Sequence, residues 1–443
     1  MNKTSPSPHS VGAEPVEAQA KRGIGATVAR APTDWKGNQM QRRIRRRYSA
    51  ERRFRLLGLF AVSLSAAFLA FLLFNMVANG FRGFTQTEIR LTIDFPRSGL
   101  RIDPVALSGA QADDALAAAD IDGVVRRAAA GQYGKDGPAY LSEGAWLRVR
   151  ERIKSDPTIL GRTETLWIPA SGALDTAAKS DAEPRDEADY RRLQDAGAVA
   201  TGFNSRFLWG ADATDPTVAG IWGAFKGSLL TMLVTLALAF PIGVLSAVYL
   251  EEYAPRNRWT DLIEVSINNL AAVPSIIFGL LGLAVFLNTM NLPRSAPLVG
   301  GLTLALMTMP VIVIAGRNAI KSVPPSIRDA ALGIGASRIQ VVFHHVLPLA
   351  LPGILTGTII GMARALGETA PLLMIGMRAF IASPPGGLTD PATVLPVQIY
   401  LWSDEVSRGF VEKTSAAIIV LLVFLLAMNG VAIYLRNKFE RRW

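Results

Sequence analysis

The stretch RDAALGIGASRIQVVFHHVLP, residues 328–348, lies between two long apolar segments of the chain. Its first part, rich in small residues, predicts a short helix, which a glycine break then ends. A second helix resumes at Pro348, where proline is tolerated because the first turn needs no amide donor. Basic residues flank the stretch and favour its location on the cytoplasmic side of a membrane. Residues 327–348, called the knob from here on, therefore predict a rigid docking surface.

The composition predicts a polytopic membrane protein. Half of the 443 residues are hydrophobic and only 19% are charged, and the mean hydropathy is positive, which is unusual for a soluble chain of this length. The chain has no cysteine and three histidines, so a disulfide scaffold and a thiolate metal site are excluded. The side chains of His344 and His345 diverge on a helix, and we expect no metal site.

The positive charge is concentrated near the start of the chain. Residues 1–55 hold 13 Lys and Arg against four Asp and Glu, and the arginine cluster at 42–55 directly precedes an apolar run at 56–78. This placement favours anchoring of a membrane helix with its N-terminus inside, rather than binding to nucleic acid. We expect residues 1–55 to form a basic cytoplasmic tail, disordered over 1–40, and residues 56–78 to form the first transmembrane helix.

A segment of different composition follows at 79–218. It contains no apolar run long enough to span a bilayer, and residues 80–218 carry 21 acidic and 17 basic residues. Alternating apolar positions predict strands at 89–95 and 163–169, while 113–130 and 183–196 are predicted to be helical. Because the first helix enters from the cytoplasm, this α+β insert is expected outside the membrane, in the periplasm.

Five further spans are predicted, at 227–250, 262–287, 298–315, 349–377 and 416–435. With six spans both termini share one side, and the basic tail at 437–443 indicates that this side is the cytoplasm. The knob then falls inside as well. Pro241, Pro274 and Pro310 lie within these spans and are expected to bend or break their helices. Gly353, Gly357 and Gly361 form a stripe along which a second helix, most simply one of the same chain, can pack closely.

Arg364 and Glu368 stand four residues apart within an apolar segment and can meet on one helix face. A charge near the middle of a bilayer costs ~2.5 to 3.5 kcal/mol on insertion scales, so Arg364 should face the bundle interior or a water-filled cavity. Two interpretations remain open here. The pair could only orient helices, or the guanidinium could attract an anion through a planar fork suited to phosphate oxygens.

Four segments together carry a family resemblance: YLEEYAP at 249–255, INNLAAVPSI at 267–276, ARALGETAP at 363–371 and VLPVQIY at 394–400. They resemble the A-type permease of the phosphate-specific ABC importer, the PstA family, over about 219–436. The knob is similar to the loop through which ABC importer permeases contact their ATPases, with Asp329 in place of the usual Glu and His345 in place of Ile or Val. The resemblance implies an all-α, six-helix permease of the type I importer class, with the α+β insert between helices 1 and 2.

The resemblance also implies site residues. The resemblance assigns Arg364 and Glu368 to the substrate pathway, and we expect Thr369 and, more weakly, Arg317 to join them. Asn268 and Asn269, just before Pro274, are polar groups that could satisfy freed backbone atoms or line the pathway, and we include them in the predicted pathway. Contact with the ATPase is expected from Arg328, Asp329, Ala330, Ala331, Gly335, Arg338, Leu347 and Pro348.

The resemblance implies a bacterial inner-membrane complex with a homologous C-type permease, two ATPase subunits and a periplasmic phosphate-binding protein. The chain has no phosphate-binding Gly-x-x-x-x-Gly-Lys-Ser/Thr loop, so ATP and Mg²⁺ are expected on the ATPase and this chain is not expected to be an enzyme. A permease for molybdate, sulfate or phosphonate is the alternative. A secondary transporter or a membrane sensor is a third, which would not need the knob.

Overall fold

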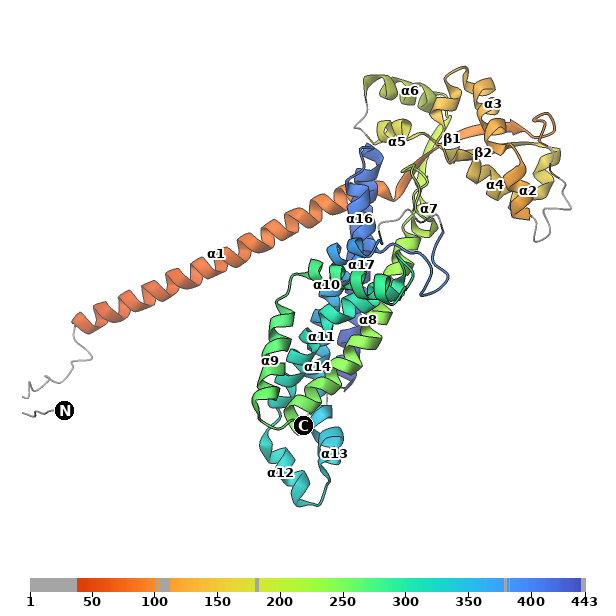
Figure 1. Cartoon of the computed structure of the whole chain (residues 1–443). Helices are drawn as coiled ribbons and strands as arrows, with labels where there is room; N and C mark the ends of the chain where they lie inside the picture. Colours follow the sequence, from red (N-terminus) through yellow and green to blue (C-terminus); the bar gives the residue numbers. More distant parts are fainter. Residues whose placement is uncertain are drawn as a thin grey trace, which may run out of the picture. The chain divides into compact units, whose positions relative to one another are not determined.

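The computed structural model describes residues 38–100, 102, 112–179, 183–377, 381 and 383–439 (Figure 1). The tail expected at 1–40 lies outside these residues except for its last three. The chain divides into two units, 1–72 and 73–443, and the division falls within the first helix. Each unit is described by itself.

The first unit consists of most of helix α1, which runs from Asn38 to Gly83. The span predicted at 56–78 lies inside α1. The helix begins earlier than predicted because residues 42–55 contain neither proline nor glycine and are rich in arginine, a good helix former. Side chains from 56 to 72 are exposed, as those of a helix in contact with hydrocarbon would be.

The insert at the start of the second unit is an α+β domain. Strands β1 (Thr85–Asp94), β2 (Thr163–Pro169) and β3 (Val199–Phe203) form an antiparallel sheet in the order β2-β1-β3. Its helices are α2 (Ala112–Ala118), α3 (Ile121–Tyr133), α4 (Ala145–Ser155), α5 (Gly172–Ala178), α6 (Pro184–Asp195) and α7 (Ser205–Trp209). Alternate residues of β1, namely Ile89, Leu91 and Ile93, are fully buried in the insert core.

Three of the four elements predicted in the insert are confirmed: β1, β2 and α6. The helix predicted at 113–130 is wrong as a single element. Asp120 ends α2 and caps α3, with its carboxylate accepting a hydrogen bond from the Gly123 amide at 2.9 Å. Strand β3 and helix α4 were not predicted. The short β3 carries no clear alternation and is defined by its pairing with β1, where Ile89 lies opposite Val199.

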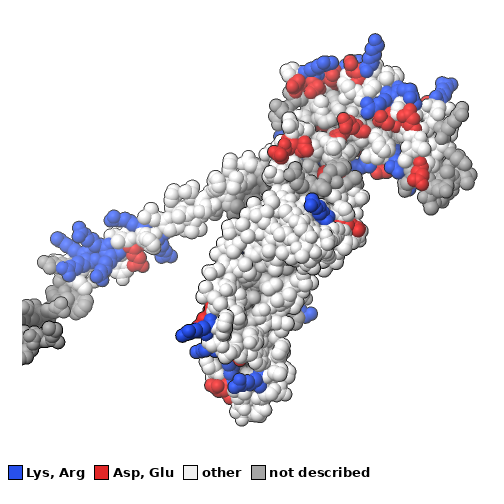
Figure 2. All heavy atoms as spheres, in the orientation of Figure 1, with Lys and Arg blue, Asp and Glu red and all other residues white. Residues whose placement is uncertain are grey.

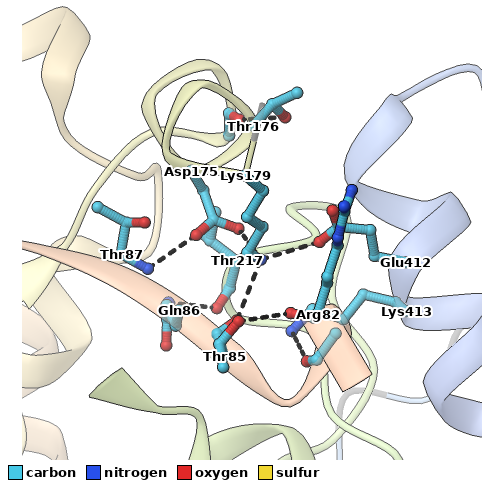
Figure 3. A network of polar contacts seen from close by, with 12 residues as sticks. Arg82, Thr85, Gln86, Thr87, Asp175, Thr176, Lys179, Thr217, Glu412 and Lys413 are labelled. Carbon is cyan, nitrogen blue, oxygen red and sulfur yellow. Dashed lines mark hydrogen bonds and ion pairs between the residues drawn. The ribbon is translucent and has the colours of Figure 1, made fainter. Parts of the chain in front are cut away.

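A polar joint connects the insert to the membrane core (Figure 3). Lys179, at the end of α5, binds Asp175 at 2.7 Å and Glu412 at 2.8 Å, and donates to the Thr85 carbonyl at 3.1 Å. Lys413 donates to the Gly83 carbonyl at 3.1 Å. These contacts fix the start of the last membrane helix against the first strand of the insert.

The membrane core begins with α8 (Trp222–Val248), which continues as the π-helix η4 (Tyr249–Tyr253). Helix α9 (Arg258–Ala271) is followed by α10 (Ser275–Gly282) and the π-helix η5 (Leu283–Thr289). Helix α11 (Pro297–Lys321) precedes the knob. The remaining helices are α14 (Leu347–Leu366), α15 (Ala370–Met374), α16 (Leu395–Ser403) and α17 (Arg408–Phe439).

Six membrane spans are consistent with the structure. Over the residues that are described, five helices are long and apolar enough to span a bilayer, and the pair Arg258–Ala271 with Ser275–Thr289 makes a sixth if it is counted as one broken span. That pair is bent by 100°, as expected from Pro274, which caps α10 and cannot continue α9. Helices α8 and α11 run through Pro241 and Pro310 without a break.

Helix α11 lies at the centre of the core and packs against α8, α9, α10 and α14. Glycines allow the closest approaches. A Cβ placed on Gly301 would lie 2.4 Å from Val234 Cβ on α8, and one placed on Gly357 would lie 2.1 Å from Ala315 Cβ. The face of the core in Figure 2 is largely free of charged side chains except near the knob and at the end next to the insert.

Candidate functional site

The knob consists of two short helices and a π-helix, and glycine geometry and capping explain its shape. Helix α12 (Pro325–Gly333) starts with a proline in its first turn. The chain then turns at Gly335, whose φ of 92° lies in the left-handed region that favours glycine. Ser337 and Gln340 form a capping box that starts α13 (Arg338–Gln340). The π-helix η6 (Val341–Val346) then leads directly into α14.

The knob has a buried and an exposed face. Ala331, Val341, Val342 and Val346 are buried in an apolar cluster with the ends of α8 and α11. Four large apolar side chains point the other way and are 46 to 83% exposed: Leu332, Ile334, Ile339 and Phe343. Sequence reasoning did not single out these four residues. Their exposure next to a packed core is typical of a surface that binds another protein.

The predicted coupling residues occupy different positions on the knob. Asp329, Ala330, Gly335 and Arg338 are exposed, while Ala331 is buried. Leu347 and Pro348 are partly buried at the start of α14. Arg328 turns inward and contacts Glu252 of η4, as described below. The expectation that these residues bind an ATPase stays a prediction.

The Arg364 and Glu368 pair is present, but its helix ends earlier than predicted. The span expected at 349–377 is wrong in its last part, because α14 ends at Leu366 and Gly367 caps it. Pro371 follows four residues later, lacks an amide donor and disfavours helical backbone before it. Arg364 thus lies in the last turn of α14 and Glu368 beyond it, with Arg364 Nε 3.6 Å from Glu368 Oε1.

Arg364 does not face the interior of this chain. Its side chain is 49% exposed, against 17% for Glu368. Since a permanent charge on an apolar helix is unfavourable against lipid, this exposed side calls for water or a second protein chain. The end of an apolar helix therefore presents a cation outward with a weakly held counter-ion.

The other predicted pathway residues lie at two places. Asn268 and Asn269 are exposed on α9, one turn before the break at Pro274. Val273 in that break packs against the cluster that contains Met362 and Leu366, so the break lies next to the end of α14. Thr369 is partly buried between α14 and α15.

Arg317 lies elsewhere and is already paired. Its neighbour Gly316 lies close to Ile354 of α14. Ile354 precedes Arg364 by ten residues, so Arg317 and Arg364 are separated by ~15 Å along this helix. Its guanidinium contacts Glu251 at 2.5 Å and Glu264 at 2.7 Å. A role for Arg317 in the pathway stays a prediction.

The glycine stripe of α14 packs inside this chain, against α11. Cβ atoms placed on Gly353, Gly357 and Gly361 would lie 2.1 to 2.9 Å from side-chain atoms of Ala319, Ala315 and Thr308. Only glycine allows these two helices to approach so closely at three successive turns. With 3.6 residues per turn, Arg364 lies about 20° from Gly357 around the helix axis, so it continues the side of α14 that carries the stripe, beyond Gly361.

Two family models match the chain. Residues 239–443 match the model described as "Binding-protein-dependent transport system inner membrane component", and residues 41–187 match a domain of unknown function, DUF3333. A solved structure of the MetNI methionine ABC transporter in an inward-facing conformation is 18% identical, with a TM-score of 0.39, and the match covers 50% of this chain and 98% of that one.

Curated relatives narrow the comparison. The probable ABC transporter permease protein YqgI of Bacillus subtilis is 32% identical over 237 residues, covering 48% of this chain and 79% of that protein. The phosphate transport system permease protein PstA of Haemophilus influenzae is 30% identical over 223 residues, covering 50% and 77%. For PstA 1 of Mycobacterium tuberculosis (H37Rv) the identity is 35% over 156 residues, and the chain spans about half of that protein.

The family model and the YqgI relative show the class: the chain belongs to the inner-membrane permeases of binding-protein-dependent ABC transporters. Within this family it is a PstA-type permease.

Proposed function

We propose that this chain is the permease subunit of an ATP-driven ABC importer that moves inorganic phosphate into the cytoplasm. Its similarity to PstA proteins supports phosphate as the substrate. The observation that carries the proposal is the outward-facing Arg364 at the end of an apolar helix. Its guanidinium suits the oxygens of phosphate, and Glu368 at 3.6 Å can hold it when no anion is bound.

The direction of Arg364 supports a pathway formed with a second permease. A homologous C-type permease that covers this side would enclose Arg364 together with the polar end of α9, where Asn268 and Asn269 are exposed. Phosphate delivered by a periplasmic binding protein would then pass between the two permeases. This arrangement keeps the charge away from lipid, as its cost in hydrocarbon requires.

The exposed apolar face of the knob suits an ATPase partner. In this proposal the termini and the knob are cytoplasmic, the insert is periplasmic, and the complex lies in the bacterial inner membrane. Two ATPase subunits bind ATP and Mg²⁺, and their closure pulls on the knobs of both permeases. The two permeases then alternate between inward-open and outward-open states.

Uptake measurements test the proposal. The chain, its C-type partner, the ATPase and the binding protein are expressed together in cells that lack their own phosphate permeases. Labelled phosphate should accumulate only when all four are present, and excess molybdate, sulfate or phosphonate should not reduce its uptake. Uptake of another oxyanion in place of phosphate would contradict the substrate assignment, and failure to co-purify any ATPase would contradict the whole proposal.

A further inference from the structure

Two consecutive acidic residues, Glu251 and Glu252, lie in the π-helix η4 at the end of α8. Their side chains are each only 12% exposed, although carboxylates are rarely buried unless they are paired. Both are paired, and their partners come from different elements. Glu252 binds the knob, while Glu251 binds the end of α11. Neither residue has a part in the function proposed above.

Arg328 joins the knob to η4 and to α11 at once. Its Nε and Nη2 donate to Glu252 Oε1 at 3.0 and 2.7 Å. Its Nη1 donates to the Val323 carbonyl at 2.7 Å and its Nη2 also donates to the Ile320 carbonyl at 3.0 Å. These carbonyls lie at the end of α11, where a helix leaves acceptors unpaired. The planar guanidinium thus fixes α12 in orientation as well as position.

Arg317 of α11 connects η4 to α9 in a similar way. Its Nε donates to Glu251 Oε1 at 2.5 Å, and its Nη2 lies 2.7 Å from Glu264 Oε2 on α9. The Arg317 side chain is 11% exposed. Because Glu251 and Glu264 hold the same guanidinium, removing either takes away one of its two carboxylate contacts. Helices α8, α9 and α11 are therefore tied together at the level of the knob.

The backbone at this point is unusual. Helix α8 ends in a π-helix against the knob, and the knob itself enters α14 through a second π-helix, η6. π-helical turns are rare and occur frequently at functional sites, because the widened turn can shift register. The π-helical turns at the end of α8 and at the start of α14 can therefore change the length or the direction of these two helices locally.

We propose that η4 transmits a displacement of the knob to α8 and α9 through Glu251 and Glu252, and we call η4 with these two acids the arm. This connection exists in addition to the direct one from η6 to α14. The inference rests on the proposed function, in which the ATPase moves the knob. It assigns positioning roles to both acids: Glu252 holds the knob through Arg328, and Glu251 holds α9 through Arg317. Neither contacts the substrate.

Spin-label distances test the mechanical connection without transport. The chain has no cysteine, so Ile334→Cys on the knob and Trp259→Cys at the start of α9, which are 83% and 74% exposed, can be labelled selectively. The intact arm should give one narrow distance distribution in the purified full chain without the ATPase, and Glu252→Gln should lose it. If Glu252→Gln does not fold, Arg328→Lys replaces it, because lysine keeps the charge but not the fork.

Lys321→Gln is the matched control. Lys321 also lies near Glu251, at 3.4 Å, but its side chain is 55% exposed, so the narrow distribution should remain. An unchanged distribution in folded Glu252→Gln or Arg328→Lys, or an equal broadening in the control, would overturn the proposal.

Coupling measurements test the functional part. In the reconstituted complex, Glu251→Gln and Glu252→Gln should each lower phosphate transported per ATP hydrolysed by about tenfold, while the ATPase still co-purifies and hydrolyses ATP. A purely structural role would reduce assembly, hydrolysis and uptake together, and that result would overturn the proposal. Exchange of the charges in Glu252→Arg with Arg328→Glu should restore part of the coupling. If the wild-type complex transports no phosphate, the proposed function is wrong. The distance experiment still tests whether the arm connects the knob to α9, because it does not depend on transport.

Discussion

Arg364 is the residue whose setting differs most from a purely structural ion pair. It ends an apolar helix, its side chain is 49% exposed, and its contact with Glu368 is long at 3.6 Å. A buried orienting pair would be closer and shielded on both sides, because burial without good geometry is unfavourable. The geometry favours a cation that can exchange its carboxylate for an anion.

Replacement of Arg364 by glutamine should remove that anion contact. A hydrogen bond to a charged group contributes about 1.5–3 kcal/mol, so phosphate uptake should fall by roughly tenfold to a hundredfold, with normal assembly. Initial uptake rates and co-purification of the partners measure the two quantities. The control is Arg294→Gln, at an exposed turn position that the proposed pathway does not include. Unimpaired uptake by Arg364→Gln would refute its role in the pathway.

Gly357 permits the closest contact between α14 and α11. A Cβ at this position would lie 2.1 Å from Ala315 Cβ, so Gly357→Ala must push the helices apart, at a cost of about 1–3 kcal/mol. We expect a lower thermal midpoint of the purified protein. Gly430→Ala is the comparison, because nothing lies within 4 Å of that position in α17 and alanine is the better helix former. Equal midpoints for the two variants would contradict the packing argument.

For single residues, the sequence predicted that Arg364 pairs with Glu368, but it did not predict the partners of Arg317 and Arg328. The spacing of four residues on a helix is local, and it made Glu368 the obvious candidate. Glu252 precedes Arg328 by 76 residues, and no local pattern selects it among the acidic residues of the chain. The motif at 249–255 was visible, but only the fold shows which arginines its acids bind.

Among the elements, the joint of α5 and α17 with β1 connects two domains of different composition (Figure 3). Lys179 is 7% exposed and bridges Asp175 and Glu412. Lys179→Met should leave two poorly exposed carboxylates facing each other and lower the free energy of unfolding by about 3 kcal/mol. Thermal unfolding of the purified chain measures this.

An exposed ion pair of the insert provides the control for Lys179→Met. Arg191 and Glu187 on α6 have side chains that are 71% and 48% exposed, so Arg191→Met should cost less than about 1 kcal/mol. If Lys179→Met is no more harmful than Arg191→Met, the joint does not contribute to stability as we infer.

The carboxylate Glu164 on β2 makes the insert sensitive to acid. Hydrogen bonds from Arg152 and then Arg162 hold the pKa of Glu164 below its usual 4.5. A lowered pKa in the folded state stabilises the fold above the unfolded value, and this contribution disappears as the pH falls below 4.5. We expect the protection of β2 amides against hydrogen exchange, corrected for intrinsic rates, to decrease in this range. In Glu164→Gln the decrease should be smaller, and an identical decrease would refute the assignment.

The helix ends also show where sequence patterns stop being informative. Hydropathy predicted one span over 349–377, but Gly367 and Pro371 end α14 and start the short α15. The proline break in the third span was predicted, since Pro274 lacks an amide donor and disfavours helical backbone at the residue before it. At Pro241 and Pro310 the helices continue, because packing of α8 on α11 holds both helices together.

At the scale of the whole molecule, the insert follows the first predicted span and the knob lies between the fourth and the fifth. If the six spans alternate in direction, the knob and both termini lie on one side of the membrane and the insert on the other, and this stays a prediction. Charge supports the same assignment, since basic residues gather before the first span and after the last.

Labelling from one side of the membrane tests this topology. Lys135→Cys in the insert and Ile334→Cys on the knob are both exposed, and the absence of native cysteine removes any background. A membrane-impermeant maleimide added to intact spheroplasts should label Lys135→Cys only. After the membrane is opened, Ile334→Cys should react as well. Labelling of Ile334→Cys in intact spheroplasts would place the knob outside and refute its contact with an ATPase.

The sequence by itself determined that the chain has several apolar spans and a separate insert, where the knob lies, and that Arg364 and Glu368 are neighbours, although it misplaced the end of the span predicted at 349–377. Each depends on hydropathy, turn chemistry or spacing over a few residues, which any environment preserves. The tertiary structure decided that the glycines of α14 meet α11, that Arg364 faces outward, and that Arg328 and Arg317 bind η4. These contacts join residues far apart in the chain, and their choice depends on how the helices pack, which no local pattern specifies.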